Sequence, residues 1–143
     1  MKKNYALKFI TVAMIIAAMV RMIFGFMMIN FISNSTIYEV VSPEILRISI
    51  FALAFVVLNV VAELIAGFVG AVNWEEAERA PACFIWGLIS LVTGVVANIL
   101  QIRCGYGASV YAWILGVGVP ALYTLAALVF LIFRVKPKKN AAN

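Results

Sequence analysis

The stretch Asn59–Gly70, NVVAELIAGFVG, places one carboxylate and one carboxamide a helical turn apart among apolar residues. The apolar sequence around it is longer than the ~20 residues that a helix needs to cross a bilayer, so we expect Asn59 and Glu63 to lie inside a membrane. A charge at that depth is costly unless another group compensates it. Arg21 is the other charged residue deep within an apolar segment. The sequence therefore predicts a fold that brings Arg21 and Glu63 together.

The composition is that of a membrane protein. Of the 143 residues, 66% are hydrophobic and 12% are charged, whereas soluble domains are about one quarter charged. The net charge of +5 does not indicate nucleic-acid binding, because most basic residues lie in the two tails and a binding face needs a contiguous basic patch. Histidine and aspartate are absent, which argues against metal hydrolysis and histidine-based triads. We expect no metal, no cofactor and no enzymatic activity.

Four apolar segments, at 9–32, 45–72, 82–102 and 108–133, are each long enough to span a bilayer. They predict an all-α integral membrane four-helix bundle, formed as one domain over residues 1–143. Because the connections are short, consecutive helices should pack as antiparallel up-and-down hairpins. Lys2 and Lys3 before an apolar run also fit a signal peptide, but the run continues to Ile32, which favours a retained first span.

Helix starts and stops can be read between these segments. A polar turn is expected at Ser33–Thr36. Ser42-Pro43-Glu44 then has the pattern of a helix start, with serine as N-cap, proline at the first helical position and an acid at the positive end of the dipole. Pro81 should start the third helix, and Cys104–Gly107 should form the last turn.

The basic residues predict the orientation. Cytoplasmic segments of membrane proteins are enriched in lysine and arginine, and seven of the eleven basic residues lie in the tails: Lys2, Lys3, Lys8, Arg134, Lys136, Lys138 and Lys139. Both termini should therefore be cytoplasmic, which four spans allow. The predicted location is a multi-pass position in the cell membrane, with the lipid bilayer as the surrounding solvent.

Arg21, Asn59 and Glu63 should share one layer of the bundle. Counted at 1.5 Å per residue from the cytoplasmic ends of their segments, they lie about 18, 20 and 14 Å deep. This intramembrane polar site has two readings. Either Arg21 and Glu63 form a static ion pair that fixes how the helices assemble, or the three residues form an ion or ligand site.

Small residues recur every three or four positions in each segment, and such stripes let helices approach closely in lipid. In the first segment the stripe is Ala13, Ala17, Arg21 and Gly25, which includes the arginine. The residues expected at helix–helix contacts are Ala17, Gly25, Gly67, Gly70, Gly94 and Gly116. Pro120 removes a backbone hydrogen bond near the middle of the fourth segment, so a kink is expected there.

The two cysteines do not suggest a redox centre. Cys83 and Cys104 flank the third segment and would be roughly 30 Å apart along one helix, whereas a disulfide needs Cα atoms within about 7 Å. We expect both to be unpaired.

The run Glu63-Leu64-Ile65-Ala66-Gly67, followed by Gly70, Asn73, Pro81 and Gly87, resembles a pattern in small bacterial four-span membrane proteins without an assigned function. The resemblance covers the second hairpin, about a third of the chain. It implies a four-helix bundle in a bacterial cytoplasmic membrane, and it carries no site residues to transfer.

Two functions are compatible with these patterns. The leading one is a non-enzymatic membrane protein that assembles with itself, as a homo-oligomer, or with a larger membrane complex, held by the polar layer of Arg21 and Glu63. The alternative is a small transporter or channel-like protein that uses Glu63, Asn59 and Arg21 as an intramembrane ion or ligand site. Water access to Glu63 separates the two, because a dry ion pair favours assembly and a wet site favours transport.

Overall fold

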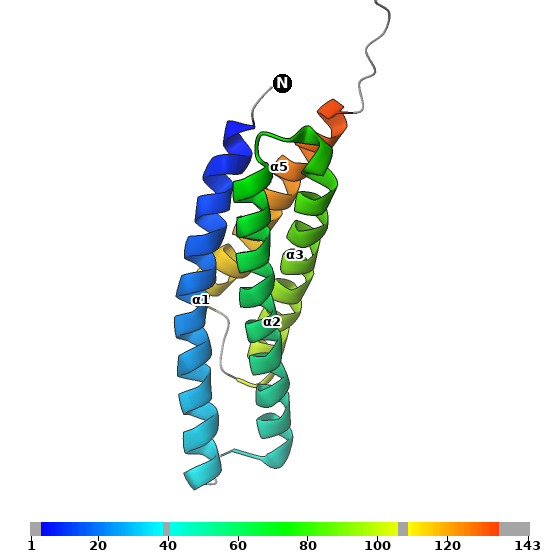
Figure 1. Cartoon of the computed structure of the whole chain (residues 1–143). Helices are drawn as coiled ribbons and strands as arrows, with labels where there is room; N and C mark the ends of the chain where they lie inside the picture. The colour runs from blue at the N-terminus through cyan, green and yellow to red at the C-terminus, as the bar shows by residue number, and fades with distance from the viewer. Residues whose placement is uncertain (1–3, 39–40, 106–108, 135–143) are drawn as a thin grey trace, which may run out of the picture.

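The computed structural model describes residues 4–38, 41–105 and 109–134, and within these ranges the chain is a bundle of long antiparallel helices (Figure 1). The first three are α1 (Tyr5–Tyr38), α2 (Pro43–Asn73) and α3 (Ala80–Arg103). The fourth helical rod consists of α4 (Val110–Trp113), the π-helical turn η2 (Ile114–Gly118) and α5 (Val119–Arg134). All four rods are long and apolar enough to cross a membrane. The prediction of an all-α protein with four membrane-length helices is confirmed.

The predicted helix starts are found. The Ser42 hydroxyl accepts a hydrogen bond from the Ile45 amide at 3.4 Å, with Pro43 and Glu44 in the first turn of α2. Proline also stands in the first turn of α3, which begins one residue before Pro81. Gly105 follows α3 with φ +76°, a backbone conformation that glycine adopts without strain.

One boundary differs from its prediction. Helix α1 does not end at Ile32 but continues through the polar stretch that was expected to form a turn. Ser and Asn are weak helix formers rather than helix breakers, so the long apolar helix before them can continue. At 34 residues, α1 is about 51 Å long, more than the ~30 Å hydrocarbon core needs. Helices α1 and α2 extend together past the end of α3 (Figure 1).

The end of the bundle where α1 begins, here called the amino-terminal end, is tied together by Asn4. Its backbone amide donates to the Trp74 carbonyl at 3.2 Å, just after α2, and its side-chain amide donates to the Ala126 carbonyl of α5 at 3.3 Å. The Lys8 ammonium lies 4.6 Å from the centre of the Trp74 ring. These contacts hold the start of α1, the link between α2 and α3 and the last helix side by side. The link itself contains a short 3₁₀ turn, η1 (Ala77–Arg79).

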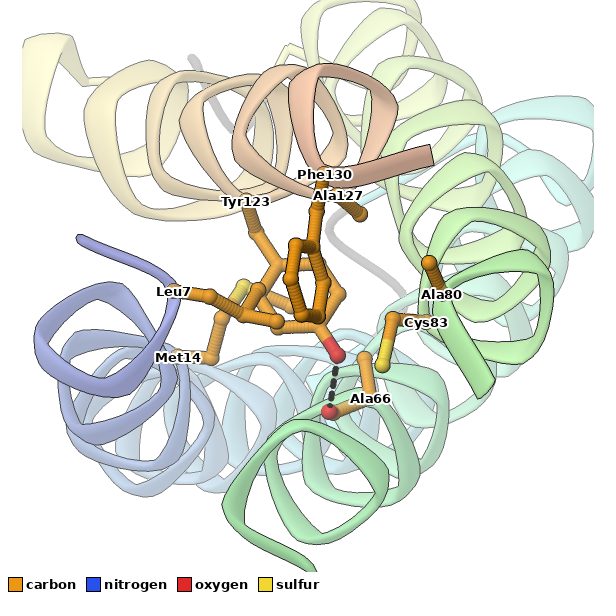
Figure 2. Packing of buried hydrophobic residues seen from close by; sticks show 8 residues of the cluster. All are labelled: Leu7, Met14, Ala66, Ala80, Cys83, Tyr123, Ala127 and Phe130. Atoms are coloured by element: carbon orange, nitrogen blue, oxygen red, sulfur yellow. Dashed lines mark hydrogen bonds between the residues drawn. The ribbon is translucent and has the colours of Figure 1, made fainter. Parts of the chain in front are cut away.

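The half of the interior near this end is filled by side chains from all four rods (Figure 2). Tyr123 of α5 reaches across the bundle, and its hydroxyl donates to the Ala66 carbonyl of α2 at 2.6 Å. Small residues beside it leave room for the ring. The cluster comprises Leu7, Met14, Ala66, Ala80, Cys83, Tyr123, Ala127 and Phe130.

A second apolar cluster lies toward the opposite end and is built from three helices only. Met28 of α1 packs there with Ala52 and Val56 of α2 and with Ala97 and Cys104, at α3 and its end. The fourth rod contributes no residue to it. Four rods therefore contribute side chains to the apolar cluster at the amino-terminal end, and three helices contribute to the cluster near the other end.

The outward faces are strongly apolar. Large hydrophobic side chains on all four rods are exposed, among them Phe9 at 74%, Phe68 at 62%, Val92 at 58% and Leu122 at 57%. Water would oppose so much exposed apolar surface, whereas lipid accepts it. The surface therefore agrees with a bundle that stands in a membrane.

Candidate intramembrane polar site

Polar side chains gather inside the bundle between the two apolar clusters. Arg21 of α1 is 2% exposed, and Asn59 and Glu63 of α2 are fully buried. Ser90 and Asn98 of α3 are fully buried beside them. Three of these five residues were predicted as the site. All three lie in the protein interior, as the small-residue faces suggested.

Arg21 is held by α3 and by the fourth rod. Its Nη1 donates to the Ala112 carbonyl at 2.9 Å, and Nη1 and Nη2 lie 3.4 and 3.5 Å from Asn98 Oδ1. Asn98 also donates from Nδ2 to the same Ala112 carbonyl at 3.1 Å. One backbone oxygen therefore accepts two side-chain hydrogen bonds, and the guanidinium is fixed between two helices. We call Asn98, the Ala112 carbonyl and Gly116 the arginine cradle.

The irregular backbone of the fourth rod explains this arrangement. The Val119 amide bonds back to the Ile114 carbonyl, five residues earlier, which is the spacing of a π-helix. Pro120 next to it has no N–H to offer the carbonyl of Gly116. Buried backbone groups in lipid must be satisfied, and neighbouring side chains can do this. The irregular turn, Ile114–Gly118, lies just before Pro120, and Ala112, whose carbonyl accepts from Arg21, lies two residues before the turn.

Gly116 is required for the guanidinium to fit. A Cβ atom on Gly116 would overlap Arg21 Nη1, and one on Gly94 would overlap the Gly116 carbonyl oxygen. At Gly94 the backbones of α3 and the π turn therefore approach with no side chain between them, and the Arg21 side chain of α1 lies against Gly116. This close approach is what small residues permit in membranes.

The other predicted packing residues also lie between helices. Ala17 is fully buried. A Cβ on Gly67 would lie 2.7 Å from Ile15 Cγ1, and one on Gly70 would lie 2.8 Å from the Tyr123 hydroxyl oxygen. Gly25 is looser, because its Cβ would meet Val56 Cγ1 at an ordinary 3.7 Å.

The buried face of α1 has a different period from the predicted stripe. Ala13 is exposed, but Ala17, Arg21 and Gly25 of the predicted stripe are buried. Apart from Ala17, the buried positions alternate in steps of four and three: Leu7, Thr11, Met14, Ala18, Arg21, Gly25 and Met28. That spacing averages 3.5 residues, the period of helices that pack at small crossing angles. The predicted stripe therefore shares Arg21 and Gly25 with this buried face, Ala17 is buried beside it, and only Ala13 lies outside it.

Asn59 is locked against α3. Its Nδ2 donates to the Ser90 carbonyl at 2.8 Å and to Thr93 Oγ1 at 3.3 Å. A carbonyl can only accept, so these bonds orient the amide and turn Oδ1 away from the Ser90 carbonyl. Oδ1 is buried and has no hydrogen-bond partner.

Glu63 is the least satisfied residue of the site. Both carboxyl oxygens are buried, and neither has a hydrogen-bond partner among the described residues. Asn59 lies one helical turn away on the same face, close to the carboxyl group. Arg21 is near enough to act on it electrostatically. Buried polar atoms without partners are rare in proteins, and each one calls for an explanation.

The sequence predicted that Arg21 and Glu63 would meet, and the arrangement found is different. The two share a layer of the bundle, yet within the described chain no hydrogen bond or ion pair joins them. Arg21 is directed instead to the cradle, where the Ala112 carbonyl oxygen and Asn98 Oδ1 accept its hydrogen bonds. A further buried donor, Arg21 Nε, has no partner.

Sequence reasoning missed the role of Asn98 and of the π turn. The four-residue step from Gly94 to Asn98 is the signal that could have placed Asn98 on the packing face. Tyr123 was missed as a core residue. No pattern in the sequence marks Ala112, because its contribution is a backbone oxygen.

The remaining candidate groups do not form a second site. Cys83 and Cys104 are both free and buried. In the ranges that the structure describes, no three His, Cys, Asp or Glu side chains gather as metal ligands would. The chemistry available at the polar site is therefore that of one carboxyl, one guanidinium, two amides and the Ser90 hydroxyl.

Comparison of the chain with models of protein families, with curated proteins and with solved structures gave no significant match.

Proposed function

We propose that the protein is a small channel-like or transporter-like membrane protein, with Glu63 as an exchangeable proton site inside the bundle. The observation that carries this proposal is the Glu63 carboxyl group, buried with both oxygens unpartnered while the nearby guanidinium is bound elsewhere. A static ion pair would have used Arg21 to satisfy Glu63. The geometry therefore favours the alternative over an assembly lock.

A proton is the ligand that best fits this space. The glycines around the site bring the helix backbones into contact, so a larger substrate would have to push them apart. A charged carboxylate without a donor is very costly in an apolar interior, whereas the neutral acid is far less so. A proton on Glu63 also supplies the donor that Asn59 Oδ1 lacks. In this arrangement Asn59 is the residue that accepts from the protonated acid.

Exchange of that proton requires a second arrangement of the bundle. Glu63 is fully buried here, so water must gain access before the proton can leave. The released proton passes to that water, and the carboxylate left behind then attracts Arg21. The protein would thus bind and release protons as its helices move, and the Glu63 O–H bond is the one bond of the chain that forms and breaks.

The proposal is tested in lipid vesicles that contain the purified protein and an internal pH-sensitive dye. After a pH step, wild-type protein should speed equilibration relative to protein-free vesicles, and Glu63→Gln should abolish the effect while remaining folded. Glu44→Gln is the matched control, because it makes the same change at an exposed position of the same helix. Equal rates for wild type and Glu63→Gln, or no acceleration by wild type, would refute the proposal.

Assembly remains a second candidate because of a groove between α1 and α2. It has a volume of about 280 Å³, an almost wholly apolar lining, and outward-facing walls that include Phe26 and Val57. In this candidate, a second copy or another membrane subunit packs its helix against the groove. Crosslinking in native-like lipid discs, with Gly25→Leu to fill the groove, tests it: a wild-type monomer would exclude self-assembly.

We further propose that both termini are cytoplasmic, in the cell membrane of a bacterium. The ends of the described chain at Tyr5 and Arg134 lie at the same end of the bundle (Figure 1), and the lysines of the tails favour the cytoplasm. Of these, Lys2, Lys3, Lys136, Lys138 and Lys139 lie outside the described residues. Reporter fusions after residue 143 should read cytoplasmic, and a tag at Gly105 should read external.

A further inference from the structure

We propose that Asn98 and the π turn of the fourth rod are the resting place of a mobile Arg21, which moves to Glu63 when Glu63 loses its proton. This inference rests on the proposed function and assigns it a coupling device. Arg21 is the charge that moves, and Asn98 is the positioning residue that decides where it rests.

First, Arg21 has two sets of possible partners, the cradle and the Glu63 carboxyl group in the same layer of the bundle. In the cradle it donates to the Ala112 carbonyl and Asn98 Oδ1. On the other side it feels the charge of Glu63. Its Nε carries a donor that the cradle leaves unused, and Glu63 carries two acceptors that nothing uses. The two unsatisfied sets complement each other.

The second step concerns charge. The cradle contains only neutral acceptors, and a guanidinium bonds to a carboxylate more strongly than to an amide or a backbone oxygen. A neutral Glu63 offers no such competition, so Arg21 rests in the cradle, as found here. An ionised Glu63 does compete, and the balance moves toward the ion pair.

The third step links this exchange to the backbone. When Arg21 leaves, the Ala112 carbonyl loses one of its two side-chain donors, and the space over Gly116 opens. A π turn differs from a regular helix by one residue of register, so residues 112–118 have an alternative hydrogen-bonding pattern available. The position of Arg21 is thereby coupled to the register of the fourth rod, next to the Pro120 break.

The other titratable groups do not replace Arg21 in this role. Among the described residues, those that lie in the same interior are Cys83 of α3, Cys104 just after α3, and Tyr123 of α5. Cys104 lies in the cluster toward the opposite end, where its thiol contacts the Gln101 carbonyl. Cys83 and Tyr123 lie in the apolar cluster toward the amino-terminal end, and the Tyr123 hydroxyl is already committed to the Ala66 carbonyl. Arg21 is the cation that faces Glu63.

The test measures where the Arg21 guanidinium lies, by solid-state NMR on the labelled full-length protein in lipid. In wild type at low pH, its nitrogens should show a short contact to the Ala112 carbonyl carbon. At high pH, a contact to the Glu63 carboxyl carbon should replace it. Identical contacts at both pH values would overturn the proposal, even if the vesicle assay shows proton movement.

Two substitutions at Asn98 sharpen the test in opposite directions. Asn98→Asp adds a carboxylate to the cradle and should hold Arg21 there at both pH values, with at least a tenfold loss of proton flux. Asn98→Ala removes an acceptor from the cradle and should move the exchange of Arg21 to Glu63 to a lower pH than in wild type. Gln101→Ala is the matched control, because it removes a buried amide one turn away that contacts Met28 Sδ rather than Arg21.

The outcomes also separate this proposal from the proposed function. Arg21 exchange without proton flux would retain the coupling device and reject transport. Proton flux without movement of Arg21 would retain transport and reject the coupling device. If Asn98→Asp fails to fold, the comparison of Asn98→Ala with wild type still tests the proposal. An Arg21 contact that is the same at every pH in Asn98→Ala and in wild type would overturn the role of Asn98.

Discussion

Two buried polar groups in this bundle lie in contrasting surroundings. In the cluster at the amino-terminal end, the Tyr123 hydroxyl donates to the Ala66 carbonyl at 2.6 Å. One turn before Ala66 on the same helix, both Glu63 oxygens are equally buried and have no partner. Helix α2 therefore carries one buried polar group whose hydrogen bond is made, the Ala66 carbonyl, and one whose hydrogen bonds are not made, the Glu63 carboxyl. The first is suited to stability, and the second to exchange with a ligand.

The largest expected effect comes from a glycine that packs against the polar site. Gly94→Ala places a methyl group against the Gly116 carbonyl oxygen, and overpacking of this kind costs about 1–3 kcal/mol or more. We expect little folded protein for Gly94→Ala. Gly25→Ala should be nearly neutral, because its new methyl meets Val56 at ordinary contact distance. Folded yield in mild detergent compares the two, and equal yields would contradict the close approach at Gly94.

The next effect concerns what stabilises Arg21. A double-mutant cycle of Arg21→Ala with Asn98→Ala should show a coupling of about 0.5–3 kcal/mol, as for residues in one hydrogen-bond network. The cycle of Arg21→Ala with Glu63→Ala should show a smaller coupling at low pH, because no direct bond joins that pair. Denaturant unfolding in mixed micelles measures both. A larger coupling energy for Arg21 with Glu63 than for Arg21 with Asn98 would place the guanidinium on Glu63 rather than in the cradle.

A smaller pair of effects compares the two polar groups directly. Tyr123→Phe removes a buried hydrogen bond and should cost about 0.5–1.5 kcal/mol of stability, with proton flux retained. Glu63→Gln removes no hydrogen bond, so stability should change little while flux is lost. Unfolding curves and vesicle assays on the same preparations provide the comparison. If Tyr123→Phe lost proton flux at unchanged stability, the Tyr123 hydroxyl would also serve proton movement, and the contrast between the two regions would be wrong.

The smallest effect is expected from the cysteines. Cys83 and Cys104 are free and buried, and cysteine in such positions behaves as a small apolar residue. The double replacement with alanine should leave flux intact and lower stability only slightly, below about 1.5 kcal/mol. A polar maleimide should label neither thiol until the protein is unfolded. Rapid labelling of Cys83 in the folded protein would show water in the cluster at the amino-terminal end.

Much of the architecture could be read from the sequence, because its causes are local. Long apolar runs force helices in lipid, where each backbone group must bond within its own segment. Ser42, Pro43 and Pro81 act on the residues next to them, so the helix starts were predictable. Burial of Arg21, Asn59 and Glu63 followed from the cost of exposing them to lipid. Location inside the bundle was thus a consequence of composition and spacing.

The partner of Arg21 was decided only by the tertiary structure. Sequence reasoning compared side-chain charges and depths, and on that basis Glu63 was the natural choice. The folded chain instead supplies a backbone oxygen, which no side-chain pattern reveals. It is the Ala112 carbonyl just before the π turn, and Asn98 lies beside it. Which backbone atoms become available, and which side chains reach them, depends on how the helices rotate and how closely their glycines let them approach. Those are properties of the packed bundle, and they left Glu63 buried and unpaired.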